Sequence, residues 1–201
     1  SYLGSIFIEM PGINSQIRFG LTRRGNTYID RVFQYVMAER GTSFTTCAFR
    51  DHWGNDEYVF DSAGVGIPGA SIERHPFHYY HTSGDNLDVT DEGSLEEIVE
   101  ILVDAVRVME SDFIPVPYQK VPIYQTRYDL YADFENDRAE HDINLGITDL
   151  LWSGLSVFDI ACRLGTSYVK VREYLTQYSE LGLIESQPIT PQFARESFDS
   201  S

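Results

Sequence analysis

The chain alternates between short apolar runs and stretches whose apolar residues follow helical spacing. An apolar run from Ser5 to Met10 predicts a buried strand, which the Pro11-Gly12 turn ends. Apolar residues recur at the spacing of one helix face over 27–40, and short runs at 45–49 and 67–72 predict two more strands. Strands that alternate with helices predict an α/β layer arrangement.

The clearest predicted helix runs from Glu92 to Met109. Acidic residues are concentrated in its first turns, where they suit the positive end of the helix dipole. One side of this helix is expected to face the core, and that side carries Leu95, Ile98, Val99, Leu102, Val103 and Val106. The segment 51–63 is instead polar, aromatic and acidic, which is typical of a loop that lines a site.

The pattern changes after Phe113. Regular structure is expected to be interrupted by three prolines, Pro115, Pro117 and Pro122. We therefore predict an α/β domain over 1–117, a connector over 118–141, and a small, mostly α domain with a C-terminal tail over 142–201.

Short helices are predicted in this second domain. The first spans 143–151, and the second spans 157–164. Ser156 is a suitable N-cap for the second helix, and Asp159 at the third helical position makes a variant of the capping box.

A third helix completes the predicted unit. The Gly165-Thr166 turn leads to Ser167, which is expected to cap a helix that ends at about Leu181, before Gly182. A helix, a tight turn and a longer helix are typical of a helix-turn-helix, and 183–186 is expected to begin a wing-like strand.

Charge limits the partners of the protein. Fifteen basic and 31 acidic residues give a net charge of −16, which repels nucleic acid phosphates and anionic membranes. No apolar run in the sequence is long enough to span a bilayer, and we expect no basic-then-apolar leader. We expect a cytoplasmic protein in which Cys47 and Cys162 are buried thiols without a disulfide.

The helix-turn-helix pattern does not predict DNA binding here, because the segment 142–185 carries a net negative charge that phosphates repel. Over 142–185 the basic residues are Arg163, Lys170 and Arg172. Six acidic residues, Asp142, Asp149, Asp159, Glu173, Glu180 and Glu185, outnumber them. The third helix carries tyrosines that suit packing, so a structural or protein-contact role is favoured over DNA reading.

Candidate site chemistry is concentrated around His81. A hydroxyl and the carboxylate of Asp85 follow this imidazole closely, as polar groups often do when they orient a metal-ligand histidine. Glu9 ends the first strand, where α/β proteins place ligand sites. Asp56 and Glu57 form an acidic pair in the 51–63 segment, where a turn or capping role is the alternative.

Three stretches, in this order, resemble the C-terminal half of the di-zinc aminopeptidase family. Ile6-Phe7-Ile8-Glu9-Met10 is similar to the family's strand that ends in an acidic zinc ligand, and Asn55-Asp56-Glu57 is similar to a segment that shapes the substrate pocket. Tyr80-His81-Thr82-Ser83-Gly84-Asp85 is similar to the segment that supplies the last histidine ligand. The order of the stretches most resembles the family's bacterial aminopeptidase-like branch, which carries a winged-helix appendage. Two shorter segments, Arg24-Gly25-Asn26-Thr27 and Asp30-Arg31, also resemble this branch.

The resemblance implies a three-layer α/β/α sheet domain with two zinc ions. His81 would bind one ion and Glu9 the other, although the family usually has aspartate at this position. Asp56, Glu57, Tyr80 and Asp85 are candidates for the substrate pocket. The catalytic base and remaining ligands are expected before Ser1, so this chain alone should bind zinc weakly and hydrolyse nothing.

We therefore predict part of a zinc-dependent aminopeptidase-like hydrolase, which would cleave a peptide or amino-acid amide with metal-activated water. A non-catalytic binding protein on the same scaffold is the first alternative, and a winged-helix transcriptional regulator is the second. Homo-oligomerisation through the C-terminal domain is left open. A single-metal site made by His75, His78 and His81 is a rival that Pro76 disfavours.

Overall fold

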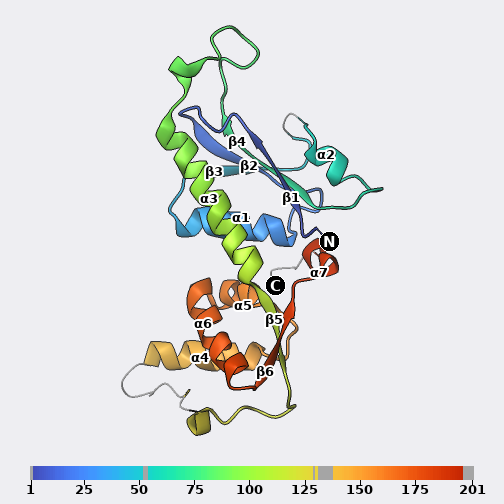
Figure 1. The fold of residues 1–201 in the computed structure, drawn as a ribbon, viewed down its shortest axis with the longest axis vertical. Coiled ribbons are helices and arrows are strands. Elements are labelled where there is room, and N and C mark those ends of the chain that lie inside the picture. The colour runs from blue at the N-terminus through green and yellow to red at the C-terminus, as the bar shows by residue number, and fades with distance from the viewer. Residues whose placement is uncertain (1, 52–53, 129, 131–137, 197–201) are drawn as a thin grey trace. The chain divides into compact units, whose positions relative to one another are not determined.

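The computed structural model describes residues 2–51, 54–128, 130 and 138–196 of the chain (Figure 1). Its elements, in order, are β1 (Ser5–Glu9), β2 (Gln16–Gly20), α1 (Tyr28–Glu39), β3 (Phe44–Cys47), α2 (Glu57–Phe60), β4 (Gly69–His75), η1 (Leu87–Val89), α3 (Glu92–Ser111), β5 (Phe113–Pro117), η2 (Gln125–Tyr128), α4 (Arg138–Leu150), α5 (Val157–Leu164), α6 (Tyr168–Glu180), β6 (Ile184–Pro188) and α7 (Pro191–Arg195). The chain forms two compact units, 1–109 with 190–201, and 110–189.

The first unit contains a mixed, mostly parallel sheet in the order β1-β4-β2-β3. β1 pairs with β4 in parallel and β2 pairs with β3 in parallel, while β2 and β4 are antiparallel. The predicted α/β class is therefore confirmed, and the predicted strands correspond to β1, β3 and β4. β2 was not predicted, because its polar residues Gln16 and Arg18 conceal a short strand.

One face of this sheet is apolar and packs against two helices. Phe19 of β2 stacks on Phe33 of α1, with ring centroids 5.5 Å apart. Ile72 is paired with Phe19 across the sheet and is fully buried. From the same face, Arg74 donates a hydrogen bond to the carbonyl oxygen of Ser94 in α3, at 3.0 Å.

α1 begins where the sequence predicts, because Thr27 and Asp30 form a capping box. The Asp30 carboxylate is fully buried and accepts hydrogen bonds from the backbone N–H groups of Thr22 and Thr27, each at 2.8 Å. This carboxylate therefore fixes the loop that enters the helix, so two of the segments that resemble the bacterial branch have a structural role.

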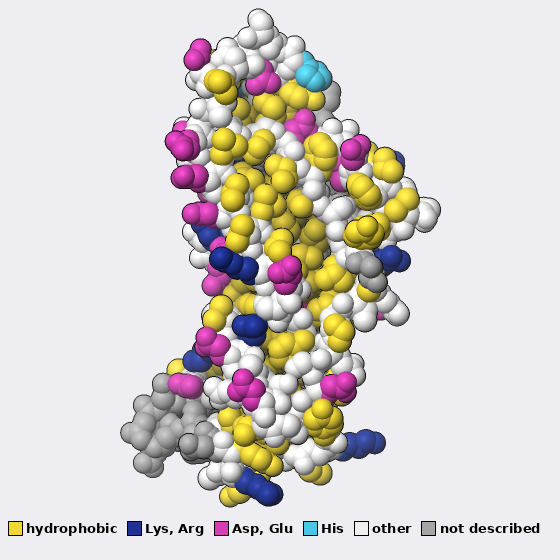
Figure 2. All heavy atoms as spheres, viewed as in Figure 1, with side chains coloured by type: hydrophobic (Ala, Val, Ile, Leu, Met, Phe, Trp, Pro, Cys, Tyr) yellow, Lys and Arg dark blue, Asp and Glu magenta, His cyan; other side chains and the backbone are white. Residues whose placement is uncertain are grey.

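α3 turns a different face to the core from the one predicted. Its buried apolar residues are Ile98, Ile101, Ala105 and Val108. Four apolar residues expected in the core are instead exposed: Leu95, Val99, Val103 and Val106. Figure 2 shows apolar side chains gathered along this helix. Apolar residues surround more than half of α3, so spacing alone could not identify its buried side.

The second unit contains α4, α5 and α6 with a two-stranded antiparallel sheet of β5 and β6. Ser156 caps α5 by accepting a hydrogen bond from the backbone N–H of Asp159, at 3.1 Å. Gly165 ends α5 in the left-handed conformation, at φ 60°. The core includes Phe158, Leu175 and Tyr178, which are buried. Three predicted helices and the strand after Gly182 are thus present, while their assignment as a winged helix stays a prediction.

Two expectations from the sequence are wrong, one for the prolines after Phe113 and one for the burial of the cysteines. Pro115 and Pro117 do not interrupt regular structure but belong to β5, because a two-stranded sheet leaves one edge of each strand without pairing requirements. β5 pairs with β6 and so belongs to the second unit, while the predicted domain bounds of 1–117, 118–141 and 142–201 stay predictions. Cys162 is exposed and Cys47 only half-buried, although neither forms a disulfide, as expected.

Candidate functional site

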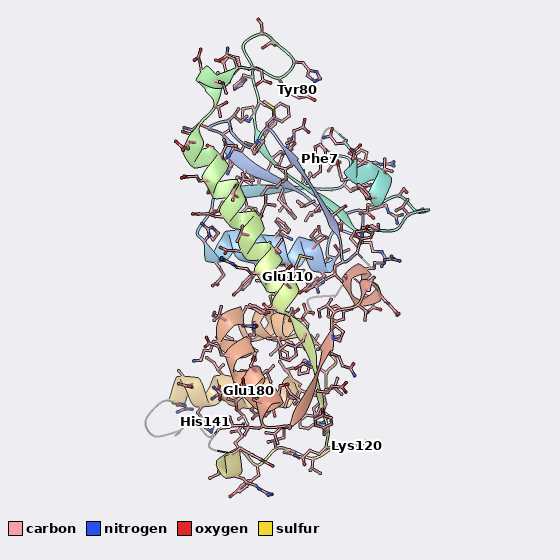
Figure 3. All side chains as sticks on the ribbon, viewed as in Figure 1. Phe7, Tyr80, Glu110, Lys120, His141 and Glu180 are labelled. Atoms are coloured by element: carbon pink, nitrogen blue, oxygen red, sulfur yellow. The ribbon has the colours of Figure 1, made fainter. Side chains whose placement is uncertain are left out.

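The candidate site lies at the end of β1 and in the loop that follows β4. β1 and β4 are parallel, with Glu9 opposite Glu73, so their carboxyl ends lie at one edge of the sheet. Figure 3 shows Tyr80 in the loop beyond that edge. Crevices at the carboxyl ends of strands are the usual ligand sites of α/β sheets.

Asn55 and Tyr80 lie beside the Glu9 carboxylate. The Asn55 side-chain amide donates a hydrogen bond to Oε2 of Glu9, at 2.5 Å. The Tyr80 hydroxyl lies close enough to this carboxylate to interact with it. Burial raises the pKa of Tyr80, and the neighbouring Glu9 charge raises the same pKa further, so the phenol stays protonated as a donor.

His81 lies against the same tyrosine. Its ring stacks on Tyr80 with centroids 3.8 Å apart and planes 19° apart. His81 is exposed and has a φ of 57°, and Met10, which follows Glu9, has a φ of 45°. Left-handed conformations of non-glycine residues are uncommon and are enriched at functional sites. Tyr80 therefore contacts both predicted metal ligands, a carboxylate through its hydroxyl and an imidazole through its ring.

A polar row crosses the face of the sheet opposite α1. In the strand register, Glu9, Glu73 and Arg18 are neighbours on β1, β4 and β2. Glu73 is 1% exposed and is paired with Nε of Arg18. Arg18 and Glu73 were not predicted from the sequence. The sequence pattern that could have identified them is the alternation of polar and apolar residues in 16–20 and 69–75, which gives the sheet a polar face.

The other pocket candidates lie around this network without joining Glu9 in any contact that the described residues show. Asp56 is the N-cap residue of α2, and its backbone carbonyl accepts the Val59 N–H at 2.9 Å. Glu57 is buried and accepts the Asn55 backbone N–H at 3.0 Å, which shapes the turn that presents the Asn55 amide. Asp85 is exposed in a turn, where its N–H donates to the Thr82 carbonyl at 3.2 Å.

A hollow of about 220 Å³ adjoins the ends of these segments. Its lining includes Met10, which follows Glu9, and Tyr79, which precedes Tyr80, together with Ile13 and Phe77. The remaining lining is mostly polar or proline, from Asn14, Ser15, Pro76 and His78 with Val89. A small apolar side chain of a ligand could occupy this space beside the Glu9 network.

The residues in place do not fit a complete zinc site. Among 2–51, 54–128, 130 and 138–196, no three His, Cys, Asp or Glu side chains are grouped so that they could hold a metal ion. Glu9 and His81 could each supply one ligand, whereas a catalytic zinc takes three from protein. The rival set of His75, His78 and His81 also fails this test, and the His75 ring instead packs edge-on against Phe77 at 5.5 Å.

Membrane insertion through a helix is not indicated. Within the described part of the chain, every helix is too short or too polar to cross a bilayer.

Known proteins resemble this chain in sequence and in fold. A protein-family model described as "Domain of unknown function (DUF4910)" matches residues 4–112. A Clostridium acetobutylicum protein named "Putative polysaccharide biosynthesis protein with aminopeptidase-like domain" is 29% identical over 93 residues, which are 45% of this chain and 21% of that protein.

A solved structure shares the fold. It is described as the "Crystal structure of putative peptidase" from Clostridium acetobutylicum, with a TM-score of 0.70 and 19% sequence identity over 90% of this chain and 42% of that chain. This chain therefore spans about a fifth of the named relative and about two fifths of the solved chain.

Proposed function

Because the chain belongs, through residues 4–112, to the family described as a domain of unknown function (DUF4910), we propose that its first unit is part of an aminopeptidase-like hydrolase. The observation that carries this proposal is the contact of Tyr80 with both Glu9 and His81. The names of the relatives, aminopeptidase-like in one case and peptidase in the other, support a peptidase-like function.

The finer proposal is that the complete protein uses zinc to hydrolyse a peptide or an amino-acid amide. Bound zinc supplies an activated water and polarises the carbonyl group. This chain's own part is to hold two candidate ligands in place. Asn55 donates a hydrogen bond to the Glu9 carboxylate, the Tyr80 hydroxyl interacts with the same carboxylate, and the Tyr80 ring stacks on the His81 imidazole. No step of hydrolysis is assigned to these residues alone.

The test is an assay of the natural full-length polypeptide with zinc on aminoacyl p-nitroanilides. We expect Glu9→Gln and His81→Ala each to lower kcat/KM by at least about 100-fold, because loss of an outer-shell partner alone typically costs about 10–100-fold. Tyr80→Phe keeps the ring and removes the hydroxyl, and we expect a loss of about 10–100-fold.

The control for this assay is Glu92→Gln, which changes an exposed carboxylate at the start of α3 and should leave kcat/KM unchanged. Undiminished activity in both Glu9→Gln and His81→Ala would contradict the proposal. A wild-type full-length protein that binds peptides and hydrolyses none would support the non-catalytic alternative.

For the second unit we propose a role other than DNA reading. Both charges among the exposed residues of α6 are negative, since these residues are Val169, Glu173, Gln177 and Glu180. The two basic residues of this helix, Lys170 and Arg172, are only partly exposed. A duplex offers phosphates that such a surface repels. Tight duplex binding that weakens steeply with salt would contradict this proposal.

A further inference from the structure

A second hollow lies in the second unit, apart from the Glu9 network. It has a volume of about 470 Å³ and is lined by α4, α6 and Ser167, the residue before α6. Ligand pockets typically enclose about 300–1,000 Å³. The pocket is therefore large enough for a small molecule. The groups that line it determine which chemical class of ligand it can bind.

Asn144 presents its side-chain amide to this pocket. Asn144 of α4 lines the hollow and is only 5% exposed. Its side chain makes no hydrogen bond with any residue of the described ranges. These amide atoms are not among the buried polar atoms that lack a partner, so the hollow reaches them and they offer a donor and an acceptor to a polar ligand.

The pocket wall beside this amide is a neutral aromatic surface. The Tyr174 hydroxyl is hydrogen-bonded to the Tyr178 hydroxyl at 3.0 Å, and burial raises the pKa of both phenols. The Tyr174 ring therefore offers an uncharged surface against which an apolar group can pack.

Two opposite charges face the same pocket without pairing. Lys170 and Glu173 lie three residues apart on α6, a spacing at which side chains of opposite charge are neighbours and can pair. Both line the hollow, and neither takes part in an ion pair with the residues that the structure describes. A ligand that carries both charges would satisfy both side chains.

The two ends of the pocket differ in charge. Ser167 is the N-cap residue of α6 and its side chain makes no capping hydrogen bond, so its hydroxyl and the first N–H groups of the helix are available near Lys170. Glu140 of α4 adds a second carboxylate to the lining with Glu173. Three residues of helix rise separate Lys170 from Glu173 by about 4.5 Å along the axis, which suits a ligand whose charges are close together.

We propose that the pocket between α4 and α6 binds a short zwitterion, either an α-amino acid or a dipeptide. The ligand carboxylate lies at Lys170 and Ser167, and its ammonium group lies at Glu173, with Glu140 opposite. An apolar ligand side chain packs on Val169 and Tyr174, and Asn144 bonds the ligand's polar backbone atoms. This site does not depend on the proposed function of the first unit.

The experiment is an NMR titration of the isotopically labelled 201-residue chain with L-leucine and with L-leucyl-L-leucine. We expect saturable shifts of the amides of α4 and α6. N-acetyl-leucine lacks the ammonium and leucinamide lacks the carboxylate, so each should bind at least about tenfold more weakly than its parent, because a charge-assisted hydrogen bond is lost.

Matched variants locate the site. Lys170→Met and Glu173→Gln should each weaken binding at least about tenfold. Lys120→Met and Glu180→Gln, at two exposed residues outside the pocket that are labelled in Figure 3, should leave binding unchanged. The circular dichroism spectrum of each variant confirms that it is folded.

Three results would overturn the proposal. The first is the absence of shifts in α4 and α6 with either zwitterion at millimolar concentration. The second is equal binding of the blocked analogues. The third is wild-type affinity in both Lys170→Met and Glu173→Gln, which would place the ligand elsewhere on the chain.

Discussion

Tyr80 is the residue through which the two predicted ligands meet. The sequence placed it in the substrate pocket only because it precedes His81 in a motif. In the structure, its hydroxyl lies close enough to Glu9 to interact with the carboxylate, its ring stacks on His81, and Asn55 donates a hydrogen bond to Glu9. Motif spacing could nominate these residues, but it could not show that one side chain joins two segments about 70 positions apart.

The different burial of the two cysteines can be tested by their reactivity. Cys162 is exposed, whereas burial raises the pKa of Cys47 above its ordinary value of 9.0. A raised pKa leaves less reactive thiolate at a given pH. At pH 8 we expect iodoacetamide to modify Cys162 first, and the rate at Cys47 to keep rising as the pH passes 9.

Peptide mass spectrometry over a time course measures both cysteine sites at once. Cys162→Ser serves as the control, because it should remove the fast phase and leave the slow phase unchanged. Faster modification of Cys47 than of Cys162 would show that the burial of these two residues has been assigned in the wrong order.

α3 shows how far an element can be predicted from its pattern. Its extent was predicted to within two residues, but its buried face was not. The expected face mixed Ile98, which is buried, with Val99 and Val103, which are exposed. A helix that is apolar over most of its circumference requires its neighbours to be known before its core side can be assigned.

A pair of variants tests this assignment. V99Q/V103Q changes two exposed residues, and we expect a change of less than about 0.5 kcal/mol in the free energy of unfolding. Ile98→Gln buries an amide without a partner and should cost about 1–3 kcal/mol or more. Urea unfolding followed by circular dichroism compares them, and an equal or reversed order would contradict the buried face described for α3.

Arg74 is the residue that connects β4 to its neighbouring segments. It is 5% exposed and donates to the carbonyl oxygens of Pro11 at 3.1 Å, Ser15 at 2.7 Å and Ser94 at 3.0 Å. We expect Arg74→Met to lower the free energy of unfolding by about 3 kcal/mol or more, because these acceptors lose a buried charged donor.

Arg107→Met is the control for Arg74→Met. Arg107 has a side chain that is 74% exposed, and we expect its loss to change stability by less than about 1 kcal/mol. Thermal unfolding of the two variants side by side distinguishes a connecting role of Arg74 from a general effect of removing an arginine.

At the scale of the whole molecule, the sequence predicted the α/β class, the first strand and the helices of the second unit. It missed β2 and β5, which depend on pairing with strands far away in the sequence. It also missed the polar row that includes Arg18 and Glu73, because a row across a sheet exists only once the strand order is known. Local patterns can predict elements, whereas the site depends on contacts between distant segments.

The central proposal is that the described residues of this chain hold part of an aminopeptidase-like site without completing a zinc centre. Zinc content, measured by elemental analysis after dialysis of the purified 201-residue chain against zinc, tests this claim most directly. The account predicts clearly less than one retained ion per chain, because Glu9 and His81 offer too few ligands for tight binding. Two tightly bound zinc ions per chain would contradict it.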